Sequence, residues 1–325
     1  MHPAKSVIFF TTATGAGYGL FIWLAILSFM GVLPASPLFG LIALGVSFAL
    51  IIGGLLSSTL HLGRPERAFR ALSQWRSSWL SREGVMAILT FIPMGIFAIS
   101  WVFTSKNTGG VALIGLLGAF MAYITVFTTS MIYASLKTIP AWHNGWTKLA
   151  YLILCIMSGA VLTMALTLLM GSLTGNEKFS HAGFHLTMPT AIFLALGLIV
   201  KLLYWRHIHN SKPVSTAESA TGLGEFGKVS FAGSPHSQDN YLLKEMGFKI
   251  ARKHARKMRI IAAILGFILP LILIAVAIHH LHGMGRTIAI LIAATSCAIG
   301  LVFERWLFFA EAKHVVTLYY GESEV

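Results

Sequence analysis

Eight long apolar segments alternate with short polar segments along the chain. A helix needs about 20 mostly apolar residues to cross a bilayer, and each of these segments has that length. Inside lipid every backbone polar group must be satisfied within the protein, which favours helices over open strands. The pattern therefore predicts an all-α integral membrane protein in which residues 1–325 form a single membrane domain. The expected transmembrane helices cover residues 7–33, 37–60, 84–104, 111–136, 148–171, 187–205, 259–279 and 286–309.

The two ends of this pattern differ from its middle. The first apolar run extends to Leu33, which is too long for the core of a signal peptide, so we expect it to be retained as the first helix. The last run carries Glu304 and Arg305 near its end. Turn-forming residues separate several of the other runs, at 34–37, 107–110 and 140–145.

The composition agrees with a membrane protein. Only 11% of the 325 residues are charged and 56% are hydrophobic, whereas about 25% of residues are charged in a soluble domain. Mean hydropathy is +0.77. The only cysteines, Cys155 and Cys297, lie inside apolar runs without a CxxC motif, so the protein has no iron–sulfur or zinc motif of its own and nothing supports a disulfide.

The basic residues predict the orientation of the helices. A net charge of +13 is compatible with nucleic-acid binding, but the basic residues lie in loops that flank the spans. With eight helices both termini share a face, and that face carries 21 of the 24 Lys and Arg residues, against 3 on the other. By the positive-inside rule, both termini are cytoplasmic, in the inner membrane of a bacterium. The same basic face also suits the docking of an acidic partner.

The connection between the sixth and seventh spans, residues 206–258, is the longest polar segment and the expected cytoplasmic loop. Its first half is rich in Ser, Gly and Thr, which is typical of disorder or of a loop ordered by a partner. From Tyr241 to Arg259, basic residues alternate with apolar ones, which predicts a basic helix at the membrane interface. Such a helix contacts lipid headgroups or a docked partner, and the sequence does not separate the two.

The polar stretch between the second and third spans holds the candidate chemistry. It reads His-Leu-Gly-Arg-Pro-Glu-Arg-Ala from His61 and continues to Ser-Trp-Leu-Ser-Arg-Glu, which ends at Glu83. His61 ends one predicted helix and Glu83 begins the next, with five arginines between them. Ionisable groups at the rim of a bilayer are costly and mark a functional site by default. The structural alternative is an ion pair that holds the loop.

Quinone chemistry suits these residue types. A quinone gains or loses two electrons and two protons, so its oxygens need groups that change protonation. A histidine titrates near neutral pH, and desolvation raises the pKa of a carboxyl group toward that range. One group can hydrogen-bond a quinone oxygen while the other relays protons to water. An arginine can polarise an oxygen or fix the loop, and Leu60, Leu62, Trp79 and Leu80 can form an apolar slot for the ring.

This motif resembles the signature of the DMSO reductase anchor subunits, a DmsC-like family related to the polysulfide-reductase or NrfD-type quinone-reactive membrane subunits. The resemblance covers the whole protein, including its length and its eight spans. It implies a haem-free anchor that holds a molybdopterin catalytic subunit and an iron–sulfur, ferredoxin-like subunit. It also implies that His61 and Glu83 handle quinone protons, in a site for ubiquinone or menaquinone. The remaining residues that match the motif are Arg64, Trp79, Ser81 and Arg82.

The predicted orientation departs from the best-known members of that family. Their catalytic subunits lie outside the cytoplasm, whereas the charge pattern here places the docking face inside. This resembles the sulfite-oxidising relatives, whose electrons enter the quinone pool. The alternatives are a quinol-oxidising anchor of a reductase for DMSO or a related S- or N-oxide, and a passive tether without a redox site. A transporter would need charged or broken helices near the midplane, and the sequence contains no clear example.

Three other features favour less specific interpretations. The 13 histidines cluster at helix ends and in loops, which argues against a haem held between facing helices. His279, His280 and His282 form a cluster without carboxylates, which is more often incidental than a metal site. The glycine-rich stretch Gly15–Gly19 superficially resembles a dinucleotide loop, but it lies inside a span with no preceding strand. We therefore expect it to allow close packing between helices.

Overall fold

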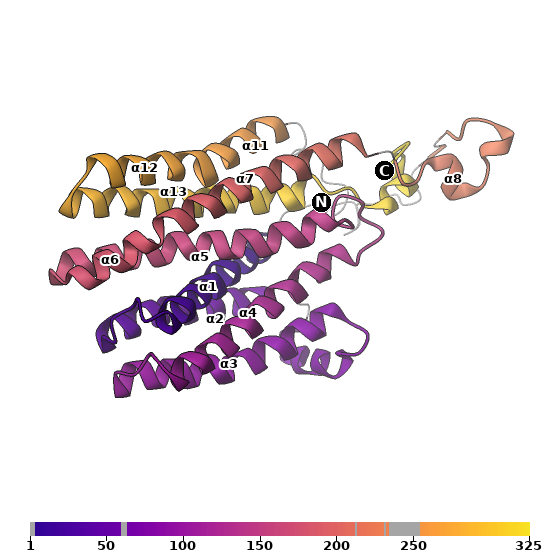
Figure 1. Cartoon of the computed structure of the whole chain (residues 1–325). Coiled ribbons are helices and arrows are strands. Elements are labelled where there is room, and N and C mark those ends of the chain that lie inside the picture. Colours follow the sequence, from indigo (N-terminus) through magenta and orange to yellow (C-terminus); the bar gives the residue numbers. More distant parts are fainter. Residues whose placement is uncertain (1–3, 60–63, 212, 231, 234–253) are drawn as a thin grey trace.

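The fold is a bundle of long helices that run side by side (Figure 1). The computed structural model describes residues 4–59, 64–211, 213–230, 232–233 and 254–325. Within these residues, eight helical stretches are long and apolar enough to cross a membrane, which confirms the all-α membrane architecture. The stretches are α1 (Lys5–Phe29), α2 (Pro37–Thr59), α3 (Trp79–Thr104), α4 (Gly110–Ala134), α5 (Gly145–Thr174), α6 with α7 (Glu177–His185 and Thr187–Asn210), α11 with η3 and α12 (Ala255–Ala263, Ile264–Ile268 and Leu269–His280), and α13 (Gly283–Ala310).

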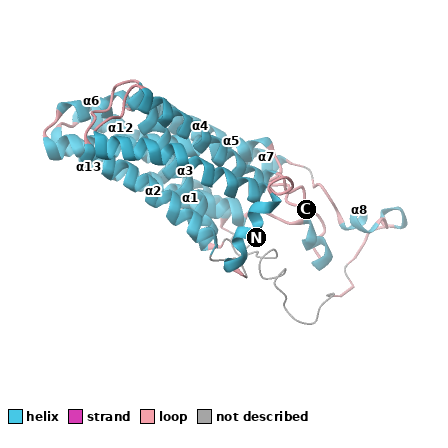
Figure 2. Ribbon diagram, turned by 90° about the horizontal axis from the view of Figure 1, so that it is seen from below, coloured by secondary structure: helices cyan, strands magenta, loops and turns pink. Residues whose placement is uncertain are grey.

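Both ends of the protein lie at the same end of the bundle. Figure 2 shows this end, with α8 (Ala217–Thr221) projecting beyond it, and we call it the N-terminal face. The short elements η1 (Pro65–Gln74), η2 (Gly224–Phe226) and η4 (Val315–Tyr320) are 3₁₀ helices. The C-terminal residues return to the segment after α7, where the backbone nitrogen of Val214 donates to the oxygen of Val325 over 2.7 Å.

Two helices, α3 and α7, extend beyond the apolar runs that predicted them. The third span begins at Trp79 rather than at residue 84, because Ser78 caps the helix by accepting a hydrogen bond from the backbone nitrogen of Ser81. Glu83 therefore lies inside the helix, in its second turn. The sixth span continues to Asn210. The expected basic helix from Tyr241 lies outside the described residues as far as residue 253.

The centre of the bundle is formed by α1 and α5. Helix α1 packs against α2, α4 and α5, and α5 also contacts α4, α6, α7 and α13. At their crossing a Cβ atom on Gly19 would lie 1.9 Å from the backbone oxygen of Cys155 and 3.1 Å from the Cα of Gly159. Only glycine allows the two backbones to approach so closely. The close packing predicted for the stretch Gly15–Gly19 is thus confirmed at Gly19, and also at Gly17, where a Cβ atom would lie 2.8 Å from the backbone oxygen of Ser47, but not at Gly15, which has no atom within 4 Å.

A second close approach joins η3 to α13. A Cβ atom on Gly300 would lie 2.1 Å from the backbone nitrogen of Gly266, and Ser296 donates a hydrogen bond to the oxygen of Leu265 over 2.8 Å. The wider π turn of η3 ends just before Pro270, whose nitrogen has no hydrogen to donate. The local departure from α-helix thus falls where the backbone ladder is already broken.

Candidate functional site

The carboxyl group of Glu83 is enclosed by the bundle near the N-terminal face. Glu83 is 4% exposed, and the hydroxyl of Thr129 on α4 donates a hydrogen bond to its Oε1 atom. The same two helices are also joined by a hydrogen bond of 3.0 Å between the hydroxyls of Thr90 and Thr125. A carboxyl group held in this way is sheltered from bulk water, and its protonation state depends on the few polar groups around it.

Arg82 precedes Glu83 in the sequence, but its side chain contacts the loop before α3 and not the interior of the bundle. Its guanidinium carbon lies 4.2 Å from the centre of the Trp79 ring. Its Nε donates to the backbone oxygen of Trp75 over 2.9 Å, and its Nη2 donates to that of Arg76 over 2.7 Å. Arg82 therefore fixes the end of the loop against α3, which is one of the two roles that the sequence allows for its arginines.

The other predicted site residues have separate positions. Ser81 is buried, at 2% exposure, in the first turn of α3. Arg64 is exposed and precedes η1. His61, with its neighbours Leu60 and Leu62, lies outside the described residues, so its role stays a prediction. The described residues thus bring together Trp79 and Arg82, while the side chain of Glu83 reaches α4 instead.

Three buried tyrosines, Tyr18, Tyr133 and Tyr151, lie within electrostatic range of Glu83. The rings of Tyr133 and Tyr151 stack with their centres 5.7 Å apart. The hydroxyl of Tyr18 is buried and has no hydrogen-bond partner within the described part of the protein. All three tyrosines lie near enough to interact electrostatically with Glu83. The sequence alone does not distinguish them, because a tyrosine inside an apolar run is usually part of the core.

A small cavity borders Thr129, the residue that donates to Glu83. Its volume is about 20 Å³. That is enough for one water molecule, because a water needs roughly 10–15 Å³ by this measure. Arg305 also lines the cavity. The remaining lining residues are Thr11, Thr12, Thr14, Gly15, Ala16, Val126, Tyr151, Leu154, Cys155, Ser158 and Leu301.

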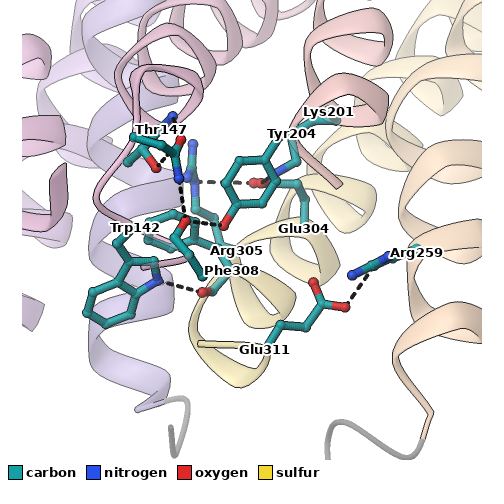
Figure 3. A network of polar contacts seen from close by, with 11 residues as sticks. Trp142, Thr147, Lys201, Tyr204, Arg259, Glu304, Arg305, Phe308 and Glu311 are labelled. Carbon is teal, nitrogen blue, oxygen red and sulfur yellow. Dashed lines mark hydrogen bonds and ion pairs between the residues drawn. The ribbon is translucent and has the colours of Figure 1, made fainter. Parts of the chain in front are cut away.

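An ionic cluster inside the bundle was not selected from the sequence. Lys201 of α7 pairs with Glu304 of α13, with 2.5 Å between Nζ and Oε1 (Figure 3). Arg305 contacts the other oxygen of the same carboxylate, with 3.4 Å between Nε and Oε2. The sequence does contain a sign of this cluster, since each of its three charged residues interrupts an apolar run. Their pairing was not visible, because Lys201 and Glu304 are far apart in the sequence and on different helices.

Side chains that can bind metals occur in the described residues but are not grouped together. No group of three or more His, Cys, Asp or Glu side chains that could hold a metal ion is found in this part of the protein, which includes His279, His280 and His282. Cys155 and Cys297 are both buried and free.

Comparisons with known proteins agree on one family. A family model described as DMSO reductase anchor subunit (DmsC) matches residues 1–321. The C subunit of the sulfite dehydrogenase of Allochromatium vinosum is 32% identical over 336 residues, which cover 98% of this chain and 99% of that protein. The YnfH chain of an anaerobic dimethyl sulfoxide reductase of Escherichia coli (strain K12) is 31% identical over 165 residues, which cover 50% of this chain and 56% of that protein. The C chain of the same organism's anaerobic dimethyl sulfoxide reductase is 31% identical over 157 residues, with coverage of 47% and 54%.

Proposed function

The chain belongs to the DMSO reductase anchor subunit family, and from this membership we propose that it is the quinone-reactive membrane anchor of a molybdenum and iron–sulfur oxidoreductase. Electrons pass between an iron–sulfur subunit, docked on the N-terminal face, and a quinone near His61 and Glu83. The chemistry of the terminal substrate takes place on the molybdopterin subunit. The anchor has no activity of its own outside the complex.

The observation that carries this proposal is the enclosed carboxyl group of Glu83. It lies in the second turn of α3, close to the face from which electrons arrive, with one hydroxyl donor from Thr129. Quinone reduction consumes two electrons and two protons, and a carboxyl group at the site can supply or accept those protons. A purely structural acid at a helix start would be expected to face solvent or cap the helix, and here Ser78 provides the cap.

The volume next to Thr129 limits where the ring can lie. A cavity of about 20 Å³ holds one water molecule and not a quinone ring. We therefore place the ring on the outer side of Glu83, next to the Trp79–Arg82 pair and Leu80, which is 52% exposed. An apolar slot with a few polar contacts is what a quinone requires. His61 then serves the second quinone oxygen, with Arg64 and Ser81 as further contacts.

The direction that we favour is sulfite oxidation coupled to quinone reduction. The similarity to the sulfite dehydrogenase protein extends over 98% of this chain, whereas the similarities to the two Escherichia coli proteins extend over about half of it. The excess of basic residues at the N-terminal face agrees with a catalytic subunit in the cytoplasm. Those half-length similarities support the reverse direction, quinol oxidation by an S-oxide reductase, as the second candidate.

The test is to change Glu83 to Gln, or His61 to Ala, and to assay the assembled complex with a quinone. We expect quinone-linked turnover to fall about 100-fold, within the range that general acid–base groups contribute. Oxidation of the terminal substrate with an artificial electron acceptor should be retained, because it bypasses the anchor. The matched control is Glu177→Gln, which removes an exposed carboxylate at the opposite end of the bundle.

Two results would count against the proposal. Unchanged quinone turnover in both variants would remove Glu83 and His61 from the site. A purified wild-type complex that cannot exchange electrons with added quinone would instead favour a passive tether.

A further inference from the structure

The ionic cluster formed by Lys201, Glu304 and Arg305 is almost completely buried inside the bundle. The three residues are 1%, 0% and 4% exposed. Lys201 lies nine residues before the end of α7, which corresponds to about 13 Å of helix. Ionisable side chains inside membrane-spanning helices are costly and are functional by default.

The charges of the cluster do not balance. Two cations share one carboxylate, which leaves one positive charge inside the bundle. The Tyr151 ring lies 3.9 Å from the Arg305 guanidinium carbon, and the Tyr204 ring lies 4.0 Å from Lys201 Nζ. These cation–π contacts stabilise the cations without cancelling their charge. The cluster therefore attracts an additional anion.

On its inner side the cluster meets the surroundings of Glu83. The water-sized cavity has Arg305 on one side and Thr129, the donor to Glu83, on another. The Nη1 atom of Arg305 is buried and has no hydrogen-bond partner among the described residues. Buried polar atoms are almost always hydrogen-bonded to protein or to ordered water. One water in the cavity would give Arg305 a partner and would lie next to Thr129, the residue that donates to Glu83.

On its outer side the cluster leads to Glu311. This residue follows Glu304 by seven positions, two helical turns, and therefore continues the same side of the helix past the end of α13. Arg259 donates to its Oε1 atom over 2.8 Å, while its Oε2 atom is buried without a hydrogen-bond partner in the described part of the protein. Burial raises the pKa of the Glu311 carboxyl group above its usual value, and Arg259 opposes that effect.

Glu311 also borders water at the N-terminal face. It lines an open recess of about 380 Å³. The charged and titratable side chains that line the recess with it are His209, Arg259, Lys313 and Glu324. Lys201 and Tyr204 both interact electrostatically with Glu311 and with Glu304. Buried charged and polar groups thus lie between the recess and the surroundings of Glu83 in an otherwise apolar bundle.

We propose that Glu311, the Lys201–Glu304 pair and one water in the cavity form a proton pathway between the N-terminal face and Glu83, with Arg305 holding the charge balance. This inference rests on the proposed quinone function. For each quinone reduced, the iron–sulfur partner supplies two electrons and the pathway supplies two protons, and quinol leaves. Lys201 gives a proton to Glu304, the water in the cavity carries it past Arg305 to Glu83, and Glu83 gives it to the quinone. Lys201 regains a proton from Glu311, so no charge accumulates, and Arg305 keeps its own proton throughout. In quinol oxidation the same protons move outward.

The decisive variant is Lys201→Arg. An arginine keeps the positive charge and the pairing with Glu304, but it does not release its proton. In the full complex we expect quinone-linked turnover to fall about tenfold or more at alkaline pH and to recover as the pH is lowered. A small membrane-permeant weak acid should restore turnover, because it carries protons past the missing step. Glu304→Gln and Glu311→Gln should show the same pH-dependent loss, and exposed Lys106→Arg at the opposite face should not.

The outcomes separate the two proposals. If Glu83→Gln abolishes quinone turnover while all three pathway variants keep the wild-type rate and pH profile, the pathway is wrong and the quinone site stands. If the wild-type complex does not react with quinone, the proposed function itself fails. If the two cluster variants do not assemble, Glu311→Gln decides the question, because it lies outside the bundle core. A wild-type profile for that variant then overturns the pathway.

Discussion

At the residue scale, Thr129 determines the environment of the carboxyl group at the candidate site. Changing Thr129 to Val removes the hydroxyl that donates to Glu83 and nearly preserves the shape of the side chain. A lost hydrogen bond to a charged group costs about 1.5–3 kcal/mol. If the bond is needed in the rate-limiting step, quinone-linked turnover of the assembled complex should fall about tenfold or more, since about 1.4 kcal/mol corresponds to a factor of ten in rate.

The neighbouring residue supplies the control at this scale. Thr128 is also buried, but its hydroxyl donates to the backbone oxygen of Thr125 in its own helix over 2.7 Å. Thr128→Val therefore removes an equivalent group without touching Glu83, and we expect turnover close to that of the wild type. Equal losses in the two variants would indicate a general disturbance of α4 rather than a specific role for the Glu83 contact.

How much of the site can be predicted from sequence depends on which residues stand out from their surroundings. Glu83 stands out, because it is a carboxylate at the start of an apolar run. Thr129 does not, because threonines inside spans commonly bond to their own helix, as Thr128 does. Lys201 and Glu304 stand out as charges, but their pairing depends on how α7 and α13 meet in three dimensions. Long-range partners of this kind cannot be obtained from one sequence.

At the element scale, the crossing of α1 and α5 depends on two glycines. Changing Gly19 to Ala would place a Cβ atom 1.9 Å from the backbone oxygen of Cys155, a rigid group that cannot move aside as a flexible side chain would. Overpacking of this kind costs about 1–3 kcal/mol or more, because the two central helices must separate. We expect a lower thermal unfolding temperature of the purified protein in detergent, together with a lower yield of assembled complex.

A second glycine in the same helix provides the comparison. Gly15→Ala adds the same methyl group on α1 where no atom lies within 4 Å of the new Cβ. Alanine also favours helix over glycine, so this variant should be as stable as the wild type or slightly more so. If Gly15→Ala and Gly19→Ala lowered the unfolding temperature equally, helix flexibility rather than close packing would explain the requirement for glycine.

The elements themselves follow from the hydropathy pattern, and their ends follow from other interactions. Eight spans are visible because burial in lipid imposes about 20 apolar residues on each. The start of α3 at Trp79 depends on the cap by Ser78 and on the packing of Arg82 against Trp79. A hydropathy pattern contains no information about either contact. The π turn of η3 lies where Gly266 meets Gly300 of α13, just before Pro270. Such local departures from regular helix require knowledge of the neighbouring element.

At the scale of the whole molecule, the asymmetry of charge links the two proposals. The N-terminal face carries most of the basic residues, the first turn of α3 and the recess lined by Glu311. Electrons from a docked partner and protons from water would therefore enter from the same side. Quinone reduction in this arrangement moves no net charge across the membrane, because electrons and protons both start on one face. The side of the membrane on which this face lies determines which compartment supplies the electrons and protons.

That orientation can be measured with fusions at the two ends of the bundle. The positive-inside rule predicts a cytoplasmic C-terminus, so a fluorescent protein fused after Val325 should fluoresce and an alkaline phosphatase fused there should be inactive. The same reporters inserted at Lys106, in the turn between α3 and α4, should give the opposite pattern. The reverse result at both sites would place the docking face outside. The partner would then have to be an exported reductase, which would favour quinol oxidation over sulfite oxidation, and the proton pathway would open to the outer compartment instead.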